Sequence, residues 1–368
     1  MSLNQPLHPE EHAGTISMSL ELQIKAEANH LGFAISGICL PDPPKHYQSY
    51  LNWLKAGCHA DMGYMANPNN QLLRADPHNI LPECQSILCL AVPYPSPLQH
   101  PKPDSDTPTG RISAYAWGQD YHTYIQTQLQ QLITTISDLV GRQIKAKSYV
   151  DTGPILEKDY AQSAGLGWIG KNSCLIIPRQ GSFFFLAELL LDLPLTHAPP
   201  CLFDGCKDCD RCIQACPTSA IRADHSIDAN RCIAYLTIEN RGAIPQALRP
   251  KLNDWIFGCD ICQSVCPHNQ HPLETHIPDA LTNPQINPFP ELVKELMLSE
   301  EAFKQKYQGT ALSRAGRQGY LRNIAIALGN QRSPEALPFL KKAAETDPDP
   351  LVCEACAWAL TQYPSRLN

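Results

Sequence analysis

The sequence contains no apolar run long enough to cross a lipid bilayer. Its longest apolar stretches, residues 183–195 and 351–360, are too short or are interrupted by charge, whereas a membrane helix needs about 20 apolar residues. The first 18 residues lack the basic segment and apolar core of a secretory signal, and we expect them to form a polar lead. We therefore predict a cytoplasmic protein that does not enter a membrane.

Charged side chains are also scarce, at 18% of 368 residues, and acids outnumber bases to give a net charge of −7. This balance argues weakly against a protein that coats nucleic acid, although a whole-chain sum can conceal a local basic surface. Hydrophobic residues make up 43% of the chain, which is typical of a folded globular protein. The length favours two or three domains.

Residues 19–200 mix helical and strand patterns, which predicts an α/β (α+β) domain. The longest helix is expected at residues 121–140, where Gly141 provides a stop signal. A second helix is expected at 154–164, with Pro154 in its first turn. Strands are predicted at 86–92 and 146–150, and a hairpin is predicted to join 174–177 to 182–191.

The rest of the chain divides into three further segments. Residues 201–270 are a cysteine-rich insert, and residues 271–290 are a proline-rich linker. Residues 291–368 carry only helical patterns, and Asp347-Pro348-Asp349-Pro350 is typical of the turn in a HEAT-like helix pair. We predict a small all-α, HEAT-like C-terminal region of at most two such units.

Half of the sixteen cysteines lie between Cys206 and Cys266. The first four are spaced C-x2-C-x2-C-x3-C and precede a proline, which is the bacterial ferredoxin pattern for [4Fe–4S] clusters. Because the fourth thiolate of that run reaches the other cube, we expect two clusters. One cluster would use Cys206, Cys209, Cys212 and Cys266, and the other would use Cys216, Cys232, Cys259 and Cys262. Two tetrahedral zinc sites are the alternative.

Four segments around this cysteine pattern make the chain resemble the epoxyqueuosine reductase family. The segments are Asp151-Thr152-Gly153-Pro154, Ala164-Gly165-Leu166-Gly167-Trp168-Ile169-Gly170-Lys171-Asn172-Ser173, Arg231-Cys232-Ile233-Ala234-Tyr235-Leu236-Thr237-Ile238-Glu239 and Gly258-Cys259-Asp260. The resemblance covers nearly the whole chain. It implies a cobalamin-dependent enzyme, related to reductive dehalogenases, that reduces epoxyqueuosine to queuosine at the wobble position of tRNA.

The resemblance also implies further partners. The substrates would be tRNAs with GUN anticodons, for Tyr, His, Asn and Asp, and a low-potential donor of unknown identity would supply electrons. Neither Asp76-Pro77-His78 nor Asp120-Tyr121-His122 completes the Asp-x-His-x-x-Gly motif of a histidine-ligated corrinoid. We therefore expect cobalamin without a protein histidine on cobalt, in a monomeric enzyme.

Reduction of an epoxide to an alkene consumes two electrons and two protons and therefore needs a proton donor. Asp151 is our candidate, because it follows an apolar run at a Thr-Gly-Pro turn and matches the family motif. The alternative is that Asp151 merely caps the helix expected from Pro154.

Cofactor contacts are expected around the glycine-rich segment that ends at Gly170, where backbone can approach a large ring. A plain turn or a solvated surface is the alternative for every candidate. The candidates for contact with cobalamin are Arg74, Lys171, Asn172, Ser173, Ser226 and Thr237.

A basic window between residues 302 and 344 carries eight Lys and Arg residues against the single acid Glu335. Such a window can bind tRNA phosphates, and the missing acidic partners favour this over a solvated helical face. The tRNA candidates are Lys304, Lys306, Arg314, Arg317 and Arg322. The window argues against a dehalogenase-like reductase of small molecules, and a ferredoxin-type electron carrier is the remaining alternative.

Overall fold

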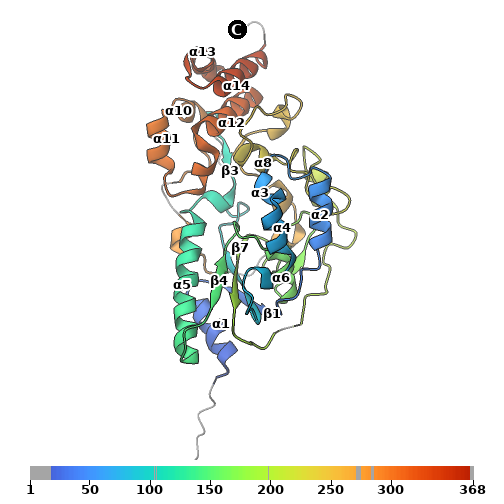
Figure 1. Ribbon diagram of the computed structural model, residues 1–368. Helices are drawn as coiled ribbons and strands as arrows, with labels where there is room; N and C mark the ends of the chain where they lie inside the picture. The colour runs from blue at the N-terminus through green and yellow to red at the C-terminus, as the bar shows by residue number, and fades with distance from the viewer. Residues whose placement is uncertain are drawn as a thin grey trace, which may run out of the picture.

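The computed structural model describes residues 18–102, 104, 106–197, 199–270, 275–282 and 286–364 (Figure 1). The polar lead predicted for residues 1–18 lies outside this part of the chain, apart from its last residue. Parts of the predicted linker also lie outside it, but Leu281 and Ile286 of that linker are buried. None of the described helices is both long and apolar enough to cross a membrane.

A four-stranded antiparallel sheet forms the centre of the N-terminal part, with strand order β1-β2-β7-β4. Helix α5 (Tyr121–Val140) packs with α1 (Leu20–His30) on one face, and α6 (Glu157–Ser163) covers the other (Figure 1). Because helices cover both faces, every residue of the central strand β2 is buried. The strands are β1 (Ile35–Cys39), β2 (Ser86–Pro93), β4 (Ala146–Tyr149) and β7 (Phe184–Leu191).

Helix α5 ends as predicted, since Gly141 adopts a left-handed conformation with φ of 67°. The predicted hairpin is present only at its tip, where Ile177 and Gly181 form an antiparallel bridge; β6 (Leu175–Ile176) pairs with β5 (Trp168–Ile169). Strand β7 instead lies between β2 and β4, where it can bury apolar residues on both faces. Helix α6 begins three residues later than predicted, because residues 151–156 form an irregular turn.

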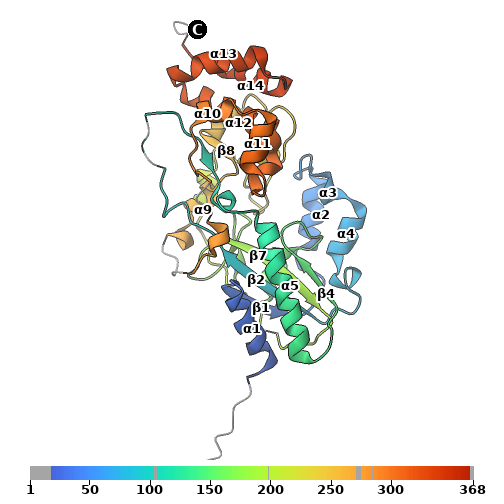
Figure 2. The same cartoon turned by 90° about the vertical axis from the view of Figure 1, so that its left-hand side faces the viewer.

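A small helical lobe is inserted between β1 and β2 and lies to one side of the sheet (Figure 2). It contains α2 (Tyr47–Lys55), α3 (Gly63–Ala66), α4 (Pro68–Ala75) and the 3-10 turn η1 (Pro77–Asn79). The cysteine-rich insert contains the short elements α7 (Arg211–Ala215), α8 (Ile233–Ile238), η3 (Arg249–Leu252), β8 (Trp255–Phe257), α9 (Ile261–Ser264) and η4 (Pro267–Asn269). Strand β8 pairs in parallel with β3 (Arg111–Ile112), which precedes η2 (Ala114–Ala116).

The described C-terminal region is helical, as predicted, and lies at the opposite end of the molecule from α1 (Figures 1 and 2). Residues 347–349 form the predicted turn, in which Asp349 caps the last helix by accepting a hydrogen bond from the Leu351 amide. After η5 (Asp279–Leu281), its elements are α10 (Leu292–Leu296), α11 (Glu300–Tyr307), η6 (Ala311–Ala315), α12 (Gly316–Gln331), η7 (Pro334–Ala336), α13 (Leu337–Thr346) and α14 (Pro350–Thr361).

Candidate active site and cluster region

A cavity of about 150 Å³ opens where the sheet, α6 and the cysteine-rich insert meet. Tyr121 and Phe185, whose rings stack 4.2 Å apart, contribute aromatic surface to its lining. Asp151 and Glu157 supply two carboxyl groups, and Gln263 enters from α9 of the insert. The cavity therefore combines an apolar wall with acids and hydrogen-bonding groups, as ligand sites do.

Asp151 lies beside this cavity with its backbone at a positive φ of 54°. Its carboxylate accepts a hydrogen bond of 2.8 Å from the Tyr121 hydroxyl, and the His122 Nε2 atom lies 3.3 Å from the same oxygen. The side chain is 57% exposed. Asp151 does not cap α6, because Leu156 occupies the N-cap position and makes no side-chain cap. The capping alternative is therefore wrong.

The charges around Asp151 favour its ionised form in this structure. Desolvation opposes ionisation, but His122 and Tyr121 together hold the pKa of Asp151 below its usual value. Desolvation likewise disfavours a charged His122, yet Asp120 and Asp151 raise the pKa of the imidazole to about 9. The Asp120 carboxylate lies 2.8 Å from Nδ1 of the ring. At neutral pH, a protonated His122 therefore bridges two carboxylates.

Two further acids lie on the α6 side of the sheet. Burial, and secondarily the charge of Asp151, raises the pKa of Glu157 to about 7. Glu188 on β7 is fully buried and neither of its carboxyl oxygens has a hydrogen-bond partner, and burial raises its pKa well above the usual value. Near neutral pH, Glu188 is therefore protonated and Glu157 exists in both forms, in contrast to the ionised Asp151.

Cys206, Cys209, Cys212 and Cys266 form the first group of neighbouring thiols. Burial raises the pKa of Cys212, and the nearby Cys206 and Cys266 thiols raise it further. Cys266 in turn has Cys206 and Cys209 as neighbours. Four thiols gathered in this way suit one four-iron cube.

Cys216, Cys232, Cys259 and Cys262 form the second group. Burial raises the pKa of Cys259, with further contributions from Cys232 and Cys216, and Cys262 has Cys259 and Cys232 as neighbours. Nowhere in the described ranges do three or more Cys, His, Asp or Glu residues converge on a single metal ion, as a zinc tetrahedron would require. Because Cys262 precedes Gln263, the second group adjoins the cavity.

None of the six residues predicted to contact cobalamin lines this cavity. Thr237 is fully buried, and its hydroxyl donates to the Ile233 carbonyl and accepts from the Gly258 amide. Both bonds are structural, and the role of Thr237 as a cofactor contact stays a prediction. Asn172 is also buried, and its side-chain oxygen accepts from the Cys174 amide.

The other cofactor candidates make contacts that position backbone. Arg74 donates to the Gly153 carbonyl at 3.3 Å, beside the Asp151 turn, and its guanidinium lies over the Tyr50 ring. The remaining three bond within or to the cysteine-rich insert: Lys171 to the Lys207 carbonyl, Ser173 to the His225 carbonyl and Ser226 to Asp224.

The cavity accommodates only part of a corrinoid, since pockets that enclose a drug-sized ligand measure roughly 300–1,000 Å³. Its groups nevertheless suit one edge of such a ring. Gln263 lies in its wall, and its amide nitrogen is already bonded to Ser182 and Tyr94, so its amide oxygen is the group that can pair with the amide side chains of a corrin. The residues that line the cavity can therefore hold one edge of a corrinoid.

Two of the predicted tRNA contacts are wrong because their guanidinium groups are not available to a ligand. Arg322 is 1% exposed and donates to three backbone carbonyls, those of Leu236, Asn240 and Gly242. The Arg317 side chain is 10% exposed and forms a bidentate pair with Asp347 at 3.1 and 2.6 Å.

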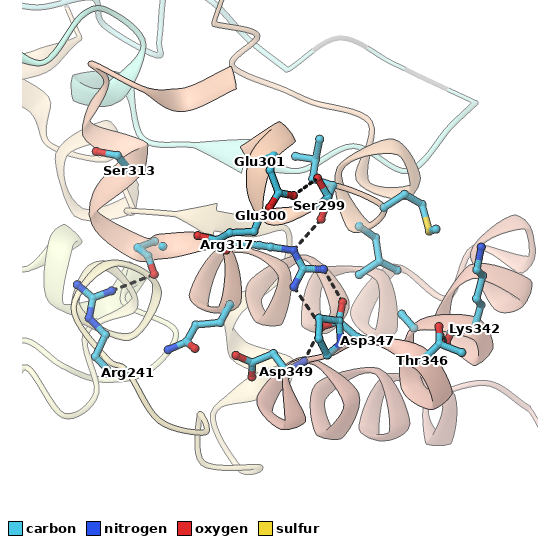
Figure 3. A pocket seen from close by; sticks show the side chains of 18 of the residues that line it. Arg241, Ser299, Glu300, Glu301, Ser313, Arg317, Lys342, Thr346, Asp347 and Asp349 are labelled. Carbon is cyan, nitrogen blue, oxygen red and sulfur yellow. Dashed lines mark hydrogen bonds and ion pairs between the residues drawn. The ribbon is translucent and has the colours of Figure 1, made fainter. Parts of the chain in front are cut away.

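Figure 3 shows Arg317 in a cleft of about 850 Å³ between the C-terminal helices, where its guanidinium also donates to the Leu298 carbonyl. Arg241 reaches the Ala315 carbonyl in the same cleft. The cleft also contains Glu300 and Glu301, as well as Asp347 and Asp349, so its basic residues face an equal number of acids. It is thus not a simple anion site.

The expectation that the basic window lacks acidic partners is also wrong. Lys304 pairs with Glu300, and Arg314 pairs with Glu239 at 2.9 Å. Lys306 pairs with a glutamate of α10. These acids lie outside the window in the sequence, which is why the local charge count missed them. The side chains of Lys304, Lys306 and Arg314 are 72%, 42% and 56% exposed.

Sequence reasoning missed His122 and Glu157 as members of the site. The triplet Asp120-Tyr121-His122 attracted attention only as an incomplete corrinoid motif, whereas its Tyr and His side chains contact Asp151. Glu157 stands six residues after Asp151, at the start of α6. The signal available in the sequence was an acid at each end of the segment between β4 and α6, Asp151 near its start and Glu157 at its end.

Two family models match the chain. Residues 205–269 match the 4Fe-4S double cluster binding domain, which contains all eight cluster cysteines. Residues 74–152 match the domain described as Epoxyqueuosine reductase QueG, DUF1730, which contains Arg74 and Asp151.

Relatives match over nearly the full length. An epoxyqueuosine reductase of Shewanella oneidensis is 39% identical over 93% of this chain and 88% of the relative. The structure of the Streptococcus thermophilus epoxyqueuosine reductase matches with a TM-score of 0.84 and 30% identity, over 94% of this chain and 90% of that one. An epoxyqueuosine reductase bound to an epoxyqueuosine-modified tRNA-Tyr stem loop matches with a TM-score of 0.83 and 29% identity, over 93% and 90%.

Proposed function

This chain belongs to the epoxyqueuosine reductase family, and from that premise we propose that it reduces the epoxide of epoxyqueuosine in tRNA to the alkene of queuosine. The observation that carries the proposal is the position of Asp151. Its carboxylate lies beside a cavity that α9 of the cysteine-rich insert helps to line. A proton donor and a source of electrons thus adjoin one space.

The electrons would pass through two [4Fe–4S] clusters. We assign the first cluster to Cys206, Cys209, Cys212 and Cys266, and the second, nearer the cavity, to the other four cysteines of the insert. When bound, cobalamin would supply a centre that gathers two electrons and passes them to the substrate. Gln263 would hold one edge of it through its amide oxygen, while Lys171 and Ser173 fix the neighbouring turn to the insert.

Asp151 would transfer the proton to the oxygen that leaves the carbon. Before the reaction that proton would reside on His122, whose Nε2 lies 3.3 Å from the Asp151 carboxylate. When substrate excludes water, the charged pair loses solvation, and transfer of the proton from His122 to Asp151 leaves two neutral groups. Asp151 is then protonated and faces the reacting oxygen. Arg74 would position this turn through its bond to the Gly153 carbonyl.

The tRNA would approach the exposed bases Lys304, Lys306 and Arg314, of which Lys304 can exchange its exposed partner Glu300 for a phosphate at low cost. We propose tRNAs with GUN anticodons as substrates. The enzyme would act as a monomer in the cytoplasm, where tRNA is found and thiolates stay reduced, with a low-potential electron donor. The C-terminal helices would serve as a HEAT-like unit.

The test is conversion of epoxyqueuosine-containing tRNA by protein purified without oxygen and loaded with cobalamin. With a chemical reductant, mass spectrometry of the digested tRNA should show queuosine, which is lighter by one oxygen. The protein should contain about eight irons, four for each cube. Stoichiometric zinc with little iron, or unchanged epoxyqueuosine, would reject the proposal.

A further inference from the structure

The proposed reduction needs two protons, yet the site as assigned above delivers only one. Asp151 receives that proton from His122, passes it to the substrate and is then a carboxylate again. After this first protonation the epoxide oxygen is a hydroxyl group, which must take a second proton to leave as water. Once cofactor and tRNA cover the cavity, exchange with bulk solvent is restricted. A second stored proton close to Asp151 would remove this limit.

Glu157 is placed to hold that proton. It lines the same cavity as Asp151 and begins α6, directly after the turn that Asp151 opens. The Asp151 backbone amide donates to its carboxyl group. Leu175, Ile177 and Leu186 line the same cavity, and this burial raises the pKa of Glu157, whereas Lys158, which also lines the cavity, lowers it.

The ionisable groups that face Glu157 favour storage of a proton in the resting state. The ionised Asp151 opposes a second negative charge, whereas Lys158 and Arg74 only partly offset this and the burial. The groups that interact with Glu157 from the surrounding elements are Asp151, Lys158, Arg74, Tyr121 and Glu188. Glu188 adds no negative charge next to Glu157, because burial keeps the Glu188 carboxyl group protonated.

We propose that Glu157 is the second proton store of this site and reloads Asp151 during the reaction. The inference rests on the proposed function. Because Glu157 acts through Asp151, it is a positioning residue for the proton and need not touch the substrate.

The two proton transfers balance the reaction in atoms and electrons. The Asp151 acid protonates the epoxide oxygen while one carbon–oxygen bond breaks, and the substrate takes up two electrons from the clusters. The Asp151 carboxylate then takes the proton of Glu157 and passes it to the hydroxyl group, which departs as water when the second carbon–oxygen bond breaks. The substrate has gained two electrons and two protons. His122 and Glu157 regain their protons from solvent after the tRNA leaves.

The experiment compares single-turnover formation of queuosine by the loaded enzyme and its Glu157→Gln variant between pH 6 and pH 9. Gln keeps the shape of a protonated Glu but stores no transferable proton. We expect a fall of about 10²-fold, the lower end of the contribution of a positioned acid. The wild-type rate should decline as pH rises through about 7, where Glu157 loses its proton, and this decline should vanish in Glu157→Gln. Glu157→Asp should restore part of the rate and part of its dependence on pH.

Infrared titration of the protein before loading gives an independent readout. A carbonyl band of a protonated carboxyl should disappear near pH 7 in the wild type and be missing in Glu157→Gln. Glu188→Gln is the matched control: it makes the same change on the same face of the sheet, at a residue that does not line the cavity. It should keep the titrating band, the rate and the pH profile.

A wild-type rate and pH profile in Glu157→Gln would overturn the inference, and so would a slow rate accompanied by loss of iron or of tRNA binding, since that result indicates a structural role. If Asp151→Asn also kept full activity, the proposed function of Asp151 would fail instead. The two failures are therefore distinguishable.

Discussion

Buried arginines in the C-terminal helices have acceptors for their donors, whereas the buried Glu188 on β7 has no hydrogen-bond partner. Arg322 donates to three backbone carbonyls, and Arg317 forms a bidentate pair with Asp347. By contrast, both carboxyl oxygens of Glu188 lack a partner. The guanidinium donors of Arg322 and Arg317 therefore have acceptors. The carboxyl group of Glu188 has no donor to stabilise its charge, and burial keeps it protonated.

This difference separates two uses of ionisable groups. A charge with a full set of partners has little freedom to change its protonation state or bind a ligand, so it contributes to structure. An acid held neutral by burial can release a proton when its surroundings change, so it can contribute to chemistry. The C-terminal arginines belong to the first kind, and Glu157 to the second.

The largest effect on folding is expected from Arg322→Met. The substitution keeps apolar volume but leaves three buried carbonyls without donors, at about 1–3 kcal/mol for each group left unsatisfied. Allowing for relaxation, we expect a loss of about 3 kcal/mol in the free energy of unfolding, measured by urea denaturation. Arg314→Met is the control, because its exposed pair with Glu239 is worth about 1 kcal/mol or less. Equal losses would break the distinction between the two arginines.

A smaller effect, on tRNA binding, is expected when Lys304, Lys306 and Arg314 are all replaced by Gln, which removes the positive charges without placing a carboxylate against the buried Glu295. Affinity for the tRNA stem loop should fall, and the dependence of log affinity on log salt should become shallower by roughly 0.7–0.9 for each phosphate that the variant no longer binds. Iron content should not change. Lys145→Gln, in the loop before β4, is the control, because this lysine is also exposed and paired with a glutamate. Unchanged binding would place the tRNA elsewhere.

The smallest effect is expected from Glu188→Gln, which should stabilise the fold. Because the pKa of Glu188 is higher in the folded state than in the unfolded state, wild-type stability declines as pH rises above the ordinary pKa of a glutamate. Gln does not titrate, so its melting temperature should exceed that of the wild type by more at pH 8 than at pH 5. A melting temperature that falls at pH 8 would mean that the carboxylate has a partner.

Local patterns in the sequence were sufficient for the double-cluster domain and the longest helix. Metal-ligand spacing and a glycine stop signal depend on neighbours along the chain, so Cys206 to Cys216 and residues 121–140 could be predicted from sequence. Asp151 was recognisable from its turn motif, but its partners Tyr121 and His122 come from another element. No local pattern identifies them.

Long-range pairing explains the errors. The acids that neutralise the basic window, such as Glu239 and Asp347, lie outside it in sequence and reach it only through folding. Likewise, β6 and β7 are neighbours in sequence, yet β7 pairs with β2 because a strand with two apolar faces is best buried at the centre of a sheet.

The proton carried by Asp151 is central to the proposed mechanism, and Asp151→Asn tests it directly. Asn keeps the size of the side chain and can still accept a hydrogen bond from Tyr121, but it cannot transfer an acid proton. In single-turnover reduction of epoxyqueuosine-containing tRNA, we predict a fall of about 10²–10⁴-fold, with iron, cobalamin and tRNA binding retained. Queuosine formation at a rate close to that of the wild type would contradict this mechanism and assign the proton to another acid of the cavity.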